Sequence, residues 1–438
     1  MLTLFDRYDH ATRELMQSLA TAGIECTPVV VEYGGELPDG VLSPFVACTG
    51  LAPHGRPLFF DEVPVPPWSE IRQGREPYGE VLLDGRAIGR IHYEANSFRE
   101  VERVDWLLPD GSVGHADHYD RHGNRYATTH YDDGAAYQTV YRGASDTEIE
   151  VHHGTRGVTV RSPGRLLAFP TLTAFVSWFL DEQGVADDRV LINSLSTPLL
   201  VMRRRGGTPR TTLWWQEPMP GGVPGNMALE LEQPRALTSI VFSDERLLAR
   251  VAAAHPGTPL ELGYLSHLGQ FADHRGFDAR RVFTLTNSDE LPWLEALLEA
   301  LPDVAFSVAA LTLMSERLHG LARRHPNLTL IPTATQRRIH EELARASVYL
   351  DVNAGAHVLD VVKAAYYLDL VVLAAAPVAK SPDHALVSGS VDELASRLTA
   401  VVAGPSGRTA ALEELHRQAG PLSTPADYAR RFGRPLIP

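Results

Sequence analysis

Two hydrophobic periods divide the chain. In residues 1–77 and 165–265, and again in 266–438, short apolar runs alternate with segments whose apolar residues recur every three or four positions, which predicts strands followed by helices. Between residues 78 and 164 apolar and polar residues alternate one by one, which predicts half-buried antiparallel strands. The pattern therefore predicts an α/β protein with two Rossmann-like domains, the first of which is interrupted by an antiparallel β-meander domain.

The first α/β region begins with a predicted strand at 2–5, a helix closed by Gly23 and a second strand at 28–32. Its first loop, residues 6–9, contains no glycine. A dinucleotide or a sugar-nucleotide diphosphate needs glycine there, because its phosphates approach the backbone closely. We therefore expect no diphosphate in this loop.

Turn residues recur within the β segment at Gly111, Gly123 and Gly134, a spacing typical of a meander. Its strands carry many aromatic residues, and an antiparallel sheet can leave one face free for a partner protein. The alternative is that these rings pack the core of the sheet itself. The residues concerned are Tyr119, Tyr126, Tyr131, Tyr137 and Tyr141.

The second α/β region contains a strand, loop, helix and strand between residues 346 and 375. This stretch resembles the unit that carries a pair of glutamates eight positions apart in retaining glycosyltransferases with two facing Rossmann-like domains. Aligning 369–371 with the Gly-x-Pro of those enzymes places the two glutamate positions at Ala356 and Ala364, and the chain has no Glu between Glu342 and Glu393. The resemblance implies the scaffold of a sugar-nucleotide pocket without its carboxylates.

The loop at residues 286–290 also lacks a feature that a sugar-nucleotide pocket needs. An active enzyme of this architecture needs a cation here or in the following helix to neutralise the donor diphosphate. The chain instead has Ser288, which we expect to cap the next helix, followed by Asp289 and Glu290. Two carboxylates at this place would repel a diphosphate.

Polar side chains stand at the predicted carboxyl ends of the strands in both α/β regions, where such sheets bind ligands. Hydroxyls, amides and an indole suit a sugar, which is held by hydrogen bonds and by an apolar ring face. The alternative for each residue is a structural cap at the end of its strand. The set comprises Asn193, Ser194, Ser196, Trp214, Gln216, Glu217, Thr286, Asn287, Asp351, Asn353 and His357.

Charge and composition exclude several classes of partner and ligand. The net charge of −14 argues against nucleic acid or an anionic membrane face bound by Coulomb attraction. The only two lysines are Lys363 and Lys380, so a P-loop, whose lysine directly follows its glycines, is excluded. No stretch approaches about 18 consecutive apolar residues. We expect a cytoplasmic protein that reaches the inner face of the membrane only through a partner.

Two other groups of residues are candidate sites. His115, Asp117, His118 and His122 suggest a metal site, but His115 and His118 would point to opposite faces of a strand, so we expect no metal there. The run 203–205 is three arginines before two glycines, which predicts a solvated turn, with an acidic partner as the alternative.

Sequence blocks spread over nearly the whole chain resemble one known family, the B-type subunit of the O-GlcNAc transferase complex that modifies serine-rich-repeat adhesins, a glycosylation chaperone of the accessory Sec system. The blocks are Leu4-Phe5-Asp6, Arg90-Ile91-His92-Tyr93, Val104-Asp105-Trp106-Leu107, Asp117-His118-Tyr119-Asp120, Ile192-Asn193-Ser194-Leu195-Ser196-Thr197-Pro198, Trp215-Gln216-Glu217-Pro218, Pro224-Gly225-Asn226-Met227 and Tyr349-Leu350-Asp351-Val352-Asn353.

The resemblance implies a GT-B-like fold with an inserted β domain, no catalysis and no cofactor or metal of its own, and a complex with a catalytic O-GlcNAc transferase subunit that binds UDP-GlcNAc. It also implies that this subunit stabilises its partner and presents a serine-rich-repeat acceptor. The family usually has Asp-Ile-Asn-His-Gly where this chain has residues 351–355, with its histidine at His357 instead. The alternative is an active retaining glycosyltransferase, because the meander also resembles that of wall-teichoic-acid glycosyltransferases.

Overall fold

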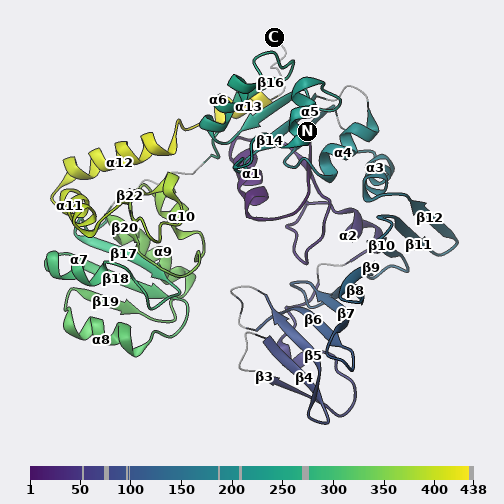
Figure 1. Cartoon of the computed structure of the whole chain (residues 1–438), viewed down its shortest axis with the longest axis horizontal. Helices are drawn as coiled ribbons and strands as arrows, with labels where there is room; N and C mark the ends of the chain where they lie inside the picture. The colour runs from purple at the N-terminus through teal and green to yellow at the C-terminus, as the bar shows by residue number, and fades with distance from the viewer. Residues whose placement is uncertain are drawn as a thin grey trace. The chain divides into compact units, whose positions relative to one another are not determined.

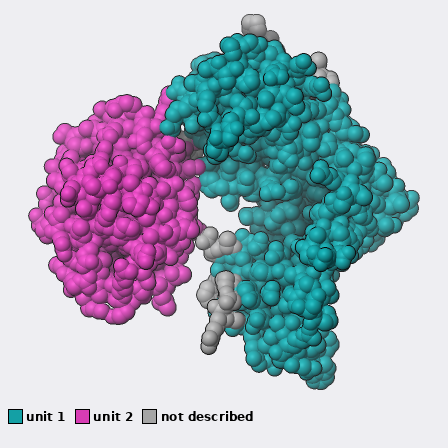
Figure 2. Space-filling model, viewed as in Figure 1, with its two compact units in different colours: residues 1–267, 423–438 teal, residues 268–422 magenta. Residues whose placement is uncertain are grey.

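The computed structural model describes residues 1–51, 54–73, 78–94, 97, 99–185, 188–206, 210–268 and 276–433. The chain forms two compact units (Figure 1 and Figure 2). Unit 1 comprises residues 1–267 and 423–438, and unit 2 comprises residues 268–422. Each unit contains a six-stranded parallel sheet, and unit 1 contains a second, antiparallel sheet.

The parallel sheet of unit 1 has the strand order β16-β15-β14-β13-β1-β2. Its central strands are buried on both faces, which is why they read as continuous apolar runs in the sequence. The strands are β1 (Leu2–Phe5), β2 (Thr27–Val30), β13 (Arg189–Ile192), β14 (Arg210–Trp215), β15 (Ser239–Phe242) and β16 (Glu261–Tyr264). The helices are α1 (His10–Thr21), α2 (Pro44–Thr49), α3 (Leu172–Glu182), α4 (Thr197–Arg205), α5 (Gly225–Glu232) and α6 (Glu245–Ala254).

The predicted antiparallel meander is confirmed as a ten-stranded sheet in which each strand pairs with its sequence neighbours. Asp84-Gly85 and Asp133-Gly134 form its tightest turns, with φ of 49° and 77° in the first pair and 46° and 74° in the second, as two-residue hairpin turns require. The strands are β3 (Ser69–Gln73), β4 (Tyr78–Leu83), β5 (Arg86–Tyr93), β6 (Val101–Leu107), β7 (Val113–Tyr119), β8 (Arg125–Asp132), β9 (Ala135–Tyr141), β10 (Glu148–His152), β11 (Val158–Ser162) and β12 (Arg165–Phe169). The sheet therefore extends beyond residues 78–164 at both ends.

This sheet buries opposite faces at its two ends. Val104 on β6 packs into a core with Ile91 and with the preceding segment, which contains the short 3₁₀ helix η1 (Phe60–Glu62). Ile149 on β10 packs instead into the core of the parallel sheet. Direct pairing through β7 to β9 puts Ile149 on the same face as Arg103, the neighbour of Val104. Because successive residues of a strand point to opposite faces, the two cores lie on opposite sides of the sheet.

Aromatic contacts join the antiparallel sheet to the first parallel sheet. Tyr141 stacks on Phe45 of α2 with ring centroids 4.2 Å apart, and Tyr126 meets Tyr33 edge to face at 4.8 Å. Tyr126 is the extra residue of a β-bulge, since its neighbours Arg125 and Ala127 pair with successive residues of β7. The five tyrosines of the sheet divide between the two alternatives, and three of them pack inside unit 1, namely Tyr119, Tyr126 and Tyr141.

The parallel sheet of unit 2 has the strand order β19-β18-β17-β20-β21-β22, and its core continues into the helices on both faces. The strands are β17 (Arg281–Thr286), β18 (Ala305–Ala310), β19 (Leu328–Ile331), β20 (Val348–Asp351), β21 (Val371–Ala375) and β22 (Leu386–Ser388). The helices are α7 (Leu294–Ala300), α8 (Glu316–Arg324), α9 (Gln336–Arg345), α10 (Val361–Tyr367), the 3₁₀ helix η2 (Pro382–His384), α11 (Val391–Val402) and α12 (Pro405–Ala419).

The last helix, α13 (Pro425–Phe432), belongs to unit 1 and not to the second α/β region in which we placed residues 266–438. Its Tyr428 is fully buried, lies 6.0 Å from the ring of Trp214 and donates its hydroxyl to the Ser266 carbonyl over 2.8 Å. The Arg189 guanidinium donates to the Phe432 carbonyl over 2.6 Å. These contacts hold the end of the chain against the first sheet.

No helix within the described ranges combines the length and the apolar character that a membrane span requires.

Candidate functional site

In unit 1 the loops that follow β1 and β13 meet, as neighbouring parallel strands require. Ser194 donates its hydroxyl to Asp6 Oδ2 over 3.2 Å, and the Asn193 carboxamide donates to Thr12 Oγ1 over 2.9 Å. Thr12 lies in the first turn of α1, whose N-cap is Asp9. Two of the predicted site residues, Asn193 and Ser194, are thus brought together with the start of α1.

This cluster contains two buried oxygen atoms with unused hydrogen-bonding capacity. Asp6 Oδ1 and Asn193 Oδ1 have no hydrogen-bond partner among the residues that the structure describes. Burial raises the pKa of Asp6, and the nearby Glu32 carboxylate adds to the shift. Both oxygens are shielded from solvent, so they mark unused acceptor capacity in the cluster and not an open binding surface. Asp6 was missing from the predicted set, although it directly follows the first strand at the same sheet edge.

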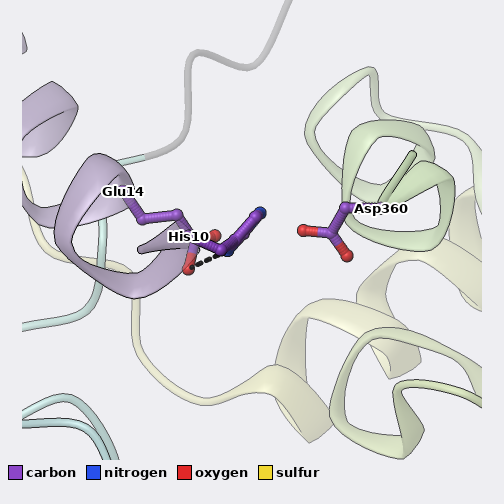
Figure 3. Close-up of side chains that lie close together, drawn as sticks. All are labelled: His10, Glu14 and Asp360. Atoms are coloured by element: carbon purple, nitrogen blue, oxygen red, sulfur yellow. Dashed lines mark ion pairs between the residues drawn. The ribbon is translucent and has the colours of Figure 1, made fainter. Parts of the chain in front are cut away.

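The start of α1 is fixed by its own side chains. Asp9 Oδ1 accepts from the Thr12 N–H over 2.8 Å, and Thr12 donates its hydroxyl to the Arg7 carbonyl over 2.7 Å. His10 and Glu14 form an ion pair of 3.5 Å one helical turn apart (Figure 3). These contacts hold the loop between β1 and α1 in one conformation.

The predicted residues after β14 are not equivalent. Trp214 is fully buried, so its indole packs the core and cannot line a cleft, and its Nε1 donates to Gln216 Oε1 over 3.1 Å. Gln216 is half-buried, while Glu217 and Ser196 are exposed. Ser196 is the N-cap of α4, and its backbone N–H donates to Ser194 Oγ over 3.0 Å.

In unit 2 the polar side chains at the strand ends form hydrogen bonds with one another. The Asn353 carboxamide nitrogen donates to Asn287 Oδ1 over 3.2 Å and to the Ala356 carbonyl over 2.9 Å. Its oxygen accepts from Thr286 Oγ1 over 2.9 Å and from the Gly355 N–H over 3.0 Å. Because these four bonds use both donors and both lone pairs of the side chain, Asn353 has nothing left to offer a ligand.

Asp351 and Lys380 form the charged part of this network. Asp351 is 1% exposed and accepts from the Lys380 backbone N–H over 2.8 Å. Burial raises the pKa of Asp351, which the hydrogen bond and the charge of Lys380 oppose. The Lys380 ammonium donates to the carbonyls of Asn353 over 2.7 Å and Val378 over 3.0 Å. The cation absent from residues 286–290 is therefore supplied to this sheet edge by the loop after β21, where it is bound to backbone oxygens.

The two positions aligned with the glutamate pair differ in their surroundings. Ala356 is exposed in the loop before α10, and Ala364 is half-buried on that helix. The helix begins at Val361, because Leu359 and Asp360 both have φ of 49°. The exposed side chains of Asn287 and His357 complete the predicted set in this unit.

The loop after β17 differs from our expectation. Ser288 caps no helix: its Oγ accepts from the Glu290 N–H over 3.0 Å, and α7 begins only at Leu294. Ser288 instead makes a tight turn, since its N–H donates to Thr286 Oγ1 over 3.0 Å. The acidic residues Asp289 and Glu290 are exposed on this turn.

The grouped histidines and arginines have separate partners. Asp117 accepts from Thr128 Oγ1 over 2.7 Å and from Trp106 Nε1 over 3.0 Å, while His118 pairs with Thr129 at 2.9 Å. The run 203–205 ends α4 and is not a solvated turn. Its first member, Arg203, donates to the fully buried Glu230 over 2.8 Å.

Four family models match successive parts of the chain: the GtfB N-terminal domain over residues 2–46, the GtfB middle domain over 69–170, the GtfB third domain over 172–253 and the GftB/GlyA-F C-terminal domain over 282–414.

Whole-chain relatives agree with these models. The chain is 32% identical over 410 residues to the UDP-N-acetylglucosamine–peptide N-acetylglucosaminyltransferase stabilising protein GtfB of Streptococcus pneumoniae, with 90% of each chain covered. It is 32% identical over 435 residues to the protein of the same name from Streptococcus gordonii, with 96% of this chain and 95% of the relative covered.

Solved structures give the same assignment. A chain from a GtfA/B complex bound to UDP and GlcNAc superimposes with a TM-score of 0.87 at 29% identity, covering 98% of this chain and 99% of that one. The pneumococcal O-GlcNAc transferase GtfA, with a TM-score of 0.57 at 12% identity, and TarM, with 0.53 at 9%, share the fold alone. The chain belongs to the GtfB family of peptide N-acetylglucosaminyltransferase stabilising proteins.

Proposed function

We propose that this chain is the non-catalytic subunit of a protein O-GlcNAc transferase complex, which stabilises a catalytic GtfA-type partner and binds the Ser/Thr-rich acceptor. In this proposal the partner binds UDP-GlcNAc, and the product is a serine-rich-repeat adhesin that leaves through the accessory Sec system. The complex works in the cytoplasm, and contact with the inner face of the membrane is made through the partner.

The saturated network of unit 2 carries the non-catalytic part of the proposal. All the hydrogen-bonding groups of the Asn353 side chain are engaged by Asn287, Thr286 and the adjacent loop. The Lys380 ammonium is bound to two backbone carbonyls. A donor nucleotide needs free hydrogen-bond donors for its phosphates and carboxylates for its sugar and ribose. The sequence supplies alanine at both glutamate positions, so the site lacks what catalysis requires.

The acceptor is assigned to unit 1, where the strand-end cluster retains free capacity. The side chains of Ser194 and Gln216 are partly exposed at this edge, which suits the hydroxyl and amide groups of a Ser/Thr-rich peptide, and the buried oxygens of Asp6 and Asn193 become available when the loops around them move. Ser194 and Gln216 stand at the same sheet edge and extend this polar surface.

Calorimetric titration of the purified chain with UDP-GlcNAc, with donor hydrolysis followed in the same samples, tests the first assignment. We expect neither binding nor turnover from the chain alone, and restored transfer when the catalytic subunit is added. Tight binding with hydrolysis by the chain alone would instead support an active glycosyltransferase.

Acceptor binding is tested by the affinity of the full complex for a Ser/Thr-rich peptide. Ser194→Ala should weaken it several-fold, because it removes a hydroxyl of the cluster without changing the sheet. Ser396→Ala on α11 of unit 2 is the matched control. Unchanged affinity in Ser194→Ala and in Asn193→Ala would move the acceptor away from this cluster.

The antiparallel sheet is assigned as the contact with the catalytic subunit. Tyr137 on β9 and Leu166 on β12 are large residues with 50% and 61% exposure, so a partner can bury them without rearrangement. Deleting the sheet is a poor test, because Ile149 and Val158 belong to the core of the parallel sheet. Tyr137→Ala with Leu166→Arg should weaken complex formation measured by analytical ultracentrifugation while each chain stays folded. An intact complex would exclude this face.

A further inference from the structure

A cavity of about 530 Å³ lies inside unit 1, between the first parallel sheet and the antiparallel sheet. One wall consists of residues 7–9, 13 and 32–36, which follow β1 and β2, and the other of residues of the antiparallel sheet region, including 119–121 and Glu100. Its size is typical of small-molecule sites, and it opens beside the carboxyl ends of parallel strands. We call it the junction pocket. None of the predicted site residues lines it.

Two of the three arginines of the junction pocket are paired with carboxylates. Arg7 Nε donates to Glu32 over 2.7 Å, and Arg121 Nη1 donates to Glu36 over 3.0 Å. The remaining arginine, Arg13, is one of only three cations in the lining, against six carboxylates. The carboxylates belong to Asp9, Glu32, Glu36, Glu94, Glu100 and Asp120. This excess of negative charge repels phosphorylated ligands, whereas carboxylates accept hydrogen bonds from hydroxyl groups.

Aromatic rings and bare backbone supply the apolar part of the lining. Tyr8 and Tyr33 are half-buried, and the Arg13 guanidinium lies 5.8 Å from the Tyr8 ring centroid. Gly35 has φ of 95°, and a Cβ there would lie 3.2 Å from the Tyr119 carbonyl, so glycine lets the two walls approach. The adjacent Gly34 has open space around the position of a Cβ. The pocket is therefore lined by tyrosine side chains and glycine backbone as well as by acceptors.

We propose that the junction pocket binds a neutral hexose-type sugar, either a hexose or an N-acetylhexosamine. Tyrosine faces pack the apolar side of a pyranose ring, and acidic acceptors bind its hydroxyls, which is the combination that neutral sugars require. The proposal concerns the sugar itself, so it stands whether or not the Asp6 and Asn193 cluster binds the acceptor peptide.

Saturation-transfer NMR of the full chain with N-acetylglucosamine and, separately, glucose tests the proposal. We expect saturable binding of at least one sugar. Glu32→Gln combined with Glu100→Gln should lower the affinity for that sugar at least tenfold. Glu70→Gln combined with Glu316→Gln removes two carboxylates that lie outside the pocket, each paired with an arginine as Glu32 is, and should leave binding unchanged.

Gly34→Arg places a long side chain at the lining without a clash at Cβ and should weaken sugar binding even if the glutamate variants are unstable. Circular dichroism of each variant confirms its fold. No saturable binding of either sugar would overturn the proposal, as would binding that Gly34→Arg leaves intact. Acceptor-peptide affinity, measured in parallel, separates this outcome from failure of the acceptor assignment.

Discussion

Phe45 and Tyr141 stack with their ring centroids 4.2 Å apart and their planes 28° from parallel. Phe45 belongs to the short helix after β2, and Tyr141 ends β9 of the antiparallel sheet. Phe45 also meets Phe175 of α3 at 5.6 Å, so the pair continues into the main core of unit 1. One aromatic contact thus ties the two sheets of this unit together.

Tyr141→Ala should therefore destabilise unit 1 by about 3 kcal/mol, because it leaves a cavity against a buried ring. Hydrogen exchange of the amides in β9 and β10 measures the local loss of protection. Tyr137→Ala, on the same strand but 50% exposed, should change it by less than about 0.5 kcal/mol. Equal effects in the two variants would mean that the stack does not hold the sheets together.

Asn353→Ala should destabilise unit 2 by about 2 kcal/mol, since it removes four hydrogen bonds and leaves the buried Thr286 hydroxyl without one of its partners. Urea unfolding, with hydrogen exchange of the amides in β17 and β20 as the readout, measures this change. Asn327→Ala, which removes two bonds to backbone carbonyls in the same unit, is the control of similar chemistry. If Asn353→Ala left stability unchanged but altered acceptor binding, the network would be a ligand site.

Arg203→Ala should cost about 3 kcal/mol, because it leaves the fully buried Glu230 carboxylate without its charged partner. The next residue, Arg204, is exposed, so Arg204→Ala should be close to neutral and serves as the matched control. Thermal unfolding of both variants at neutral pH makes the comparison. Equal melting temperatures would show that the three backbone N–H groups on Glu230 suffice to hold it.

Acidification should loosen the antiparallel sheet. Burial lowers the pKa of His118, and the charge of Arg103 adds to the shift, while Asp105 and Asp117 oppose it. The unfolded chain then takes up the proton first, so stability present above about pH 6.5 is lost as the pH falls below that value. Stability measured between pH 7.5 and 5.5 should fall in the wild type.

His118→Gln keeps a side chain that can reach Thr129 but does not titrate, so its stability should depend less on pH over the same range. His130→Gln, whose half-exposed ring lies between those of His115 and Tyr137, is the control on the neighbouring strand. Parallel pH profiles for the wild type and His118→Gln would assign the acid sensitivity elsewhere.

Local sequence patterns predicted much of this fold. The buried parallel strands appear as apolar runs, and the Asp-Gly pairs of the meander adopt the left-handed dihedral angles that only such residues tolerate easily. β3 was missed because its sequence, SEIRQ, is that of a polar edge strand. The placement of α13 was wrong because its docking depends on Trp214, more than 200 residues earlier, and no local pattern records that contact.

The sequence indicated which sheet edge carries the polar residues, but not how they pair. Trp214 looked like a cleft residue because it stands at a strand end, yet the packing of Tyr428 and His267 buries it. Lys380 follows Asp351 by 29 residues, so its role as the local cation depends on the fold of the loop after β21. Pairing of this kind is decided by tertiary packing.

The two ends of the ten-stranded sheet are held in different cores. Its β10 to β12 end is anchored in the core of the parallel sheet, whereas, among the described residues, its β3 to β6 end packs into a separate core with Tyr119 and the segment that precedes it. A load applied at the far end passes through consecutive ladders of backbone hydrogen bonds, which are stiff along the sheet. The outer strands and the first parallel sheet are therefore linked mechanically through the intervening strands, although they belong to different cores.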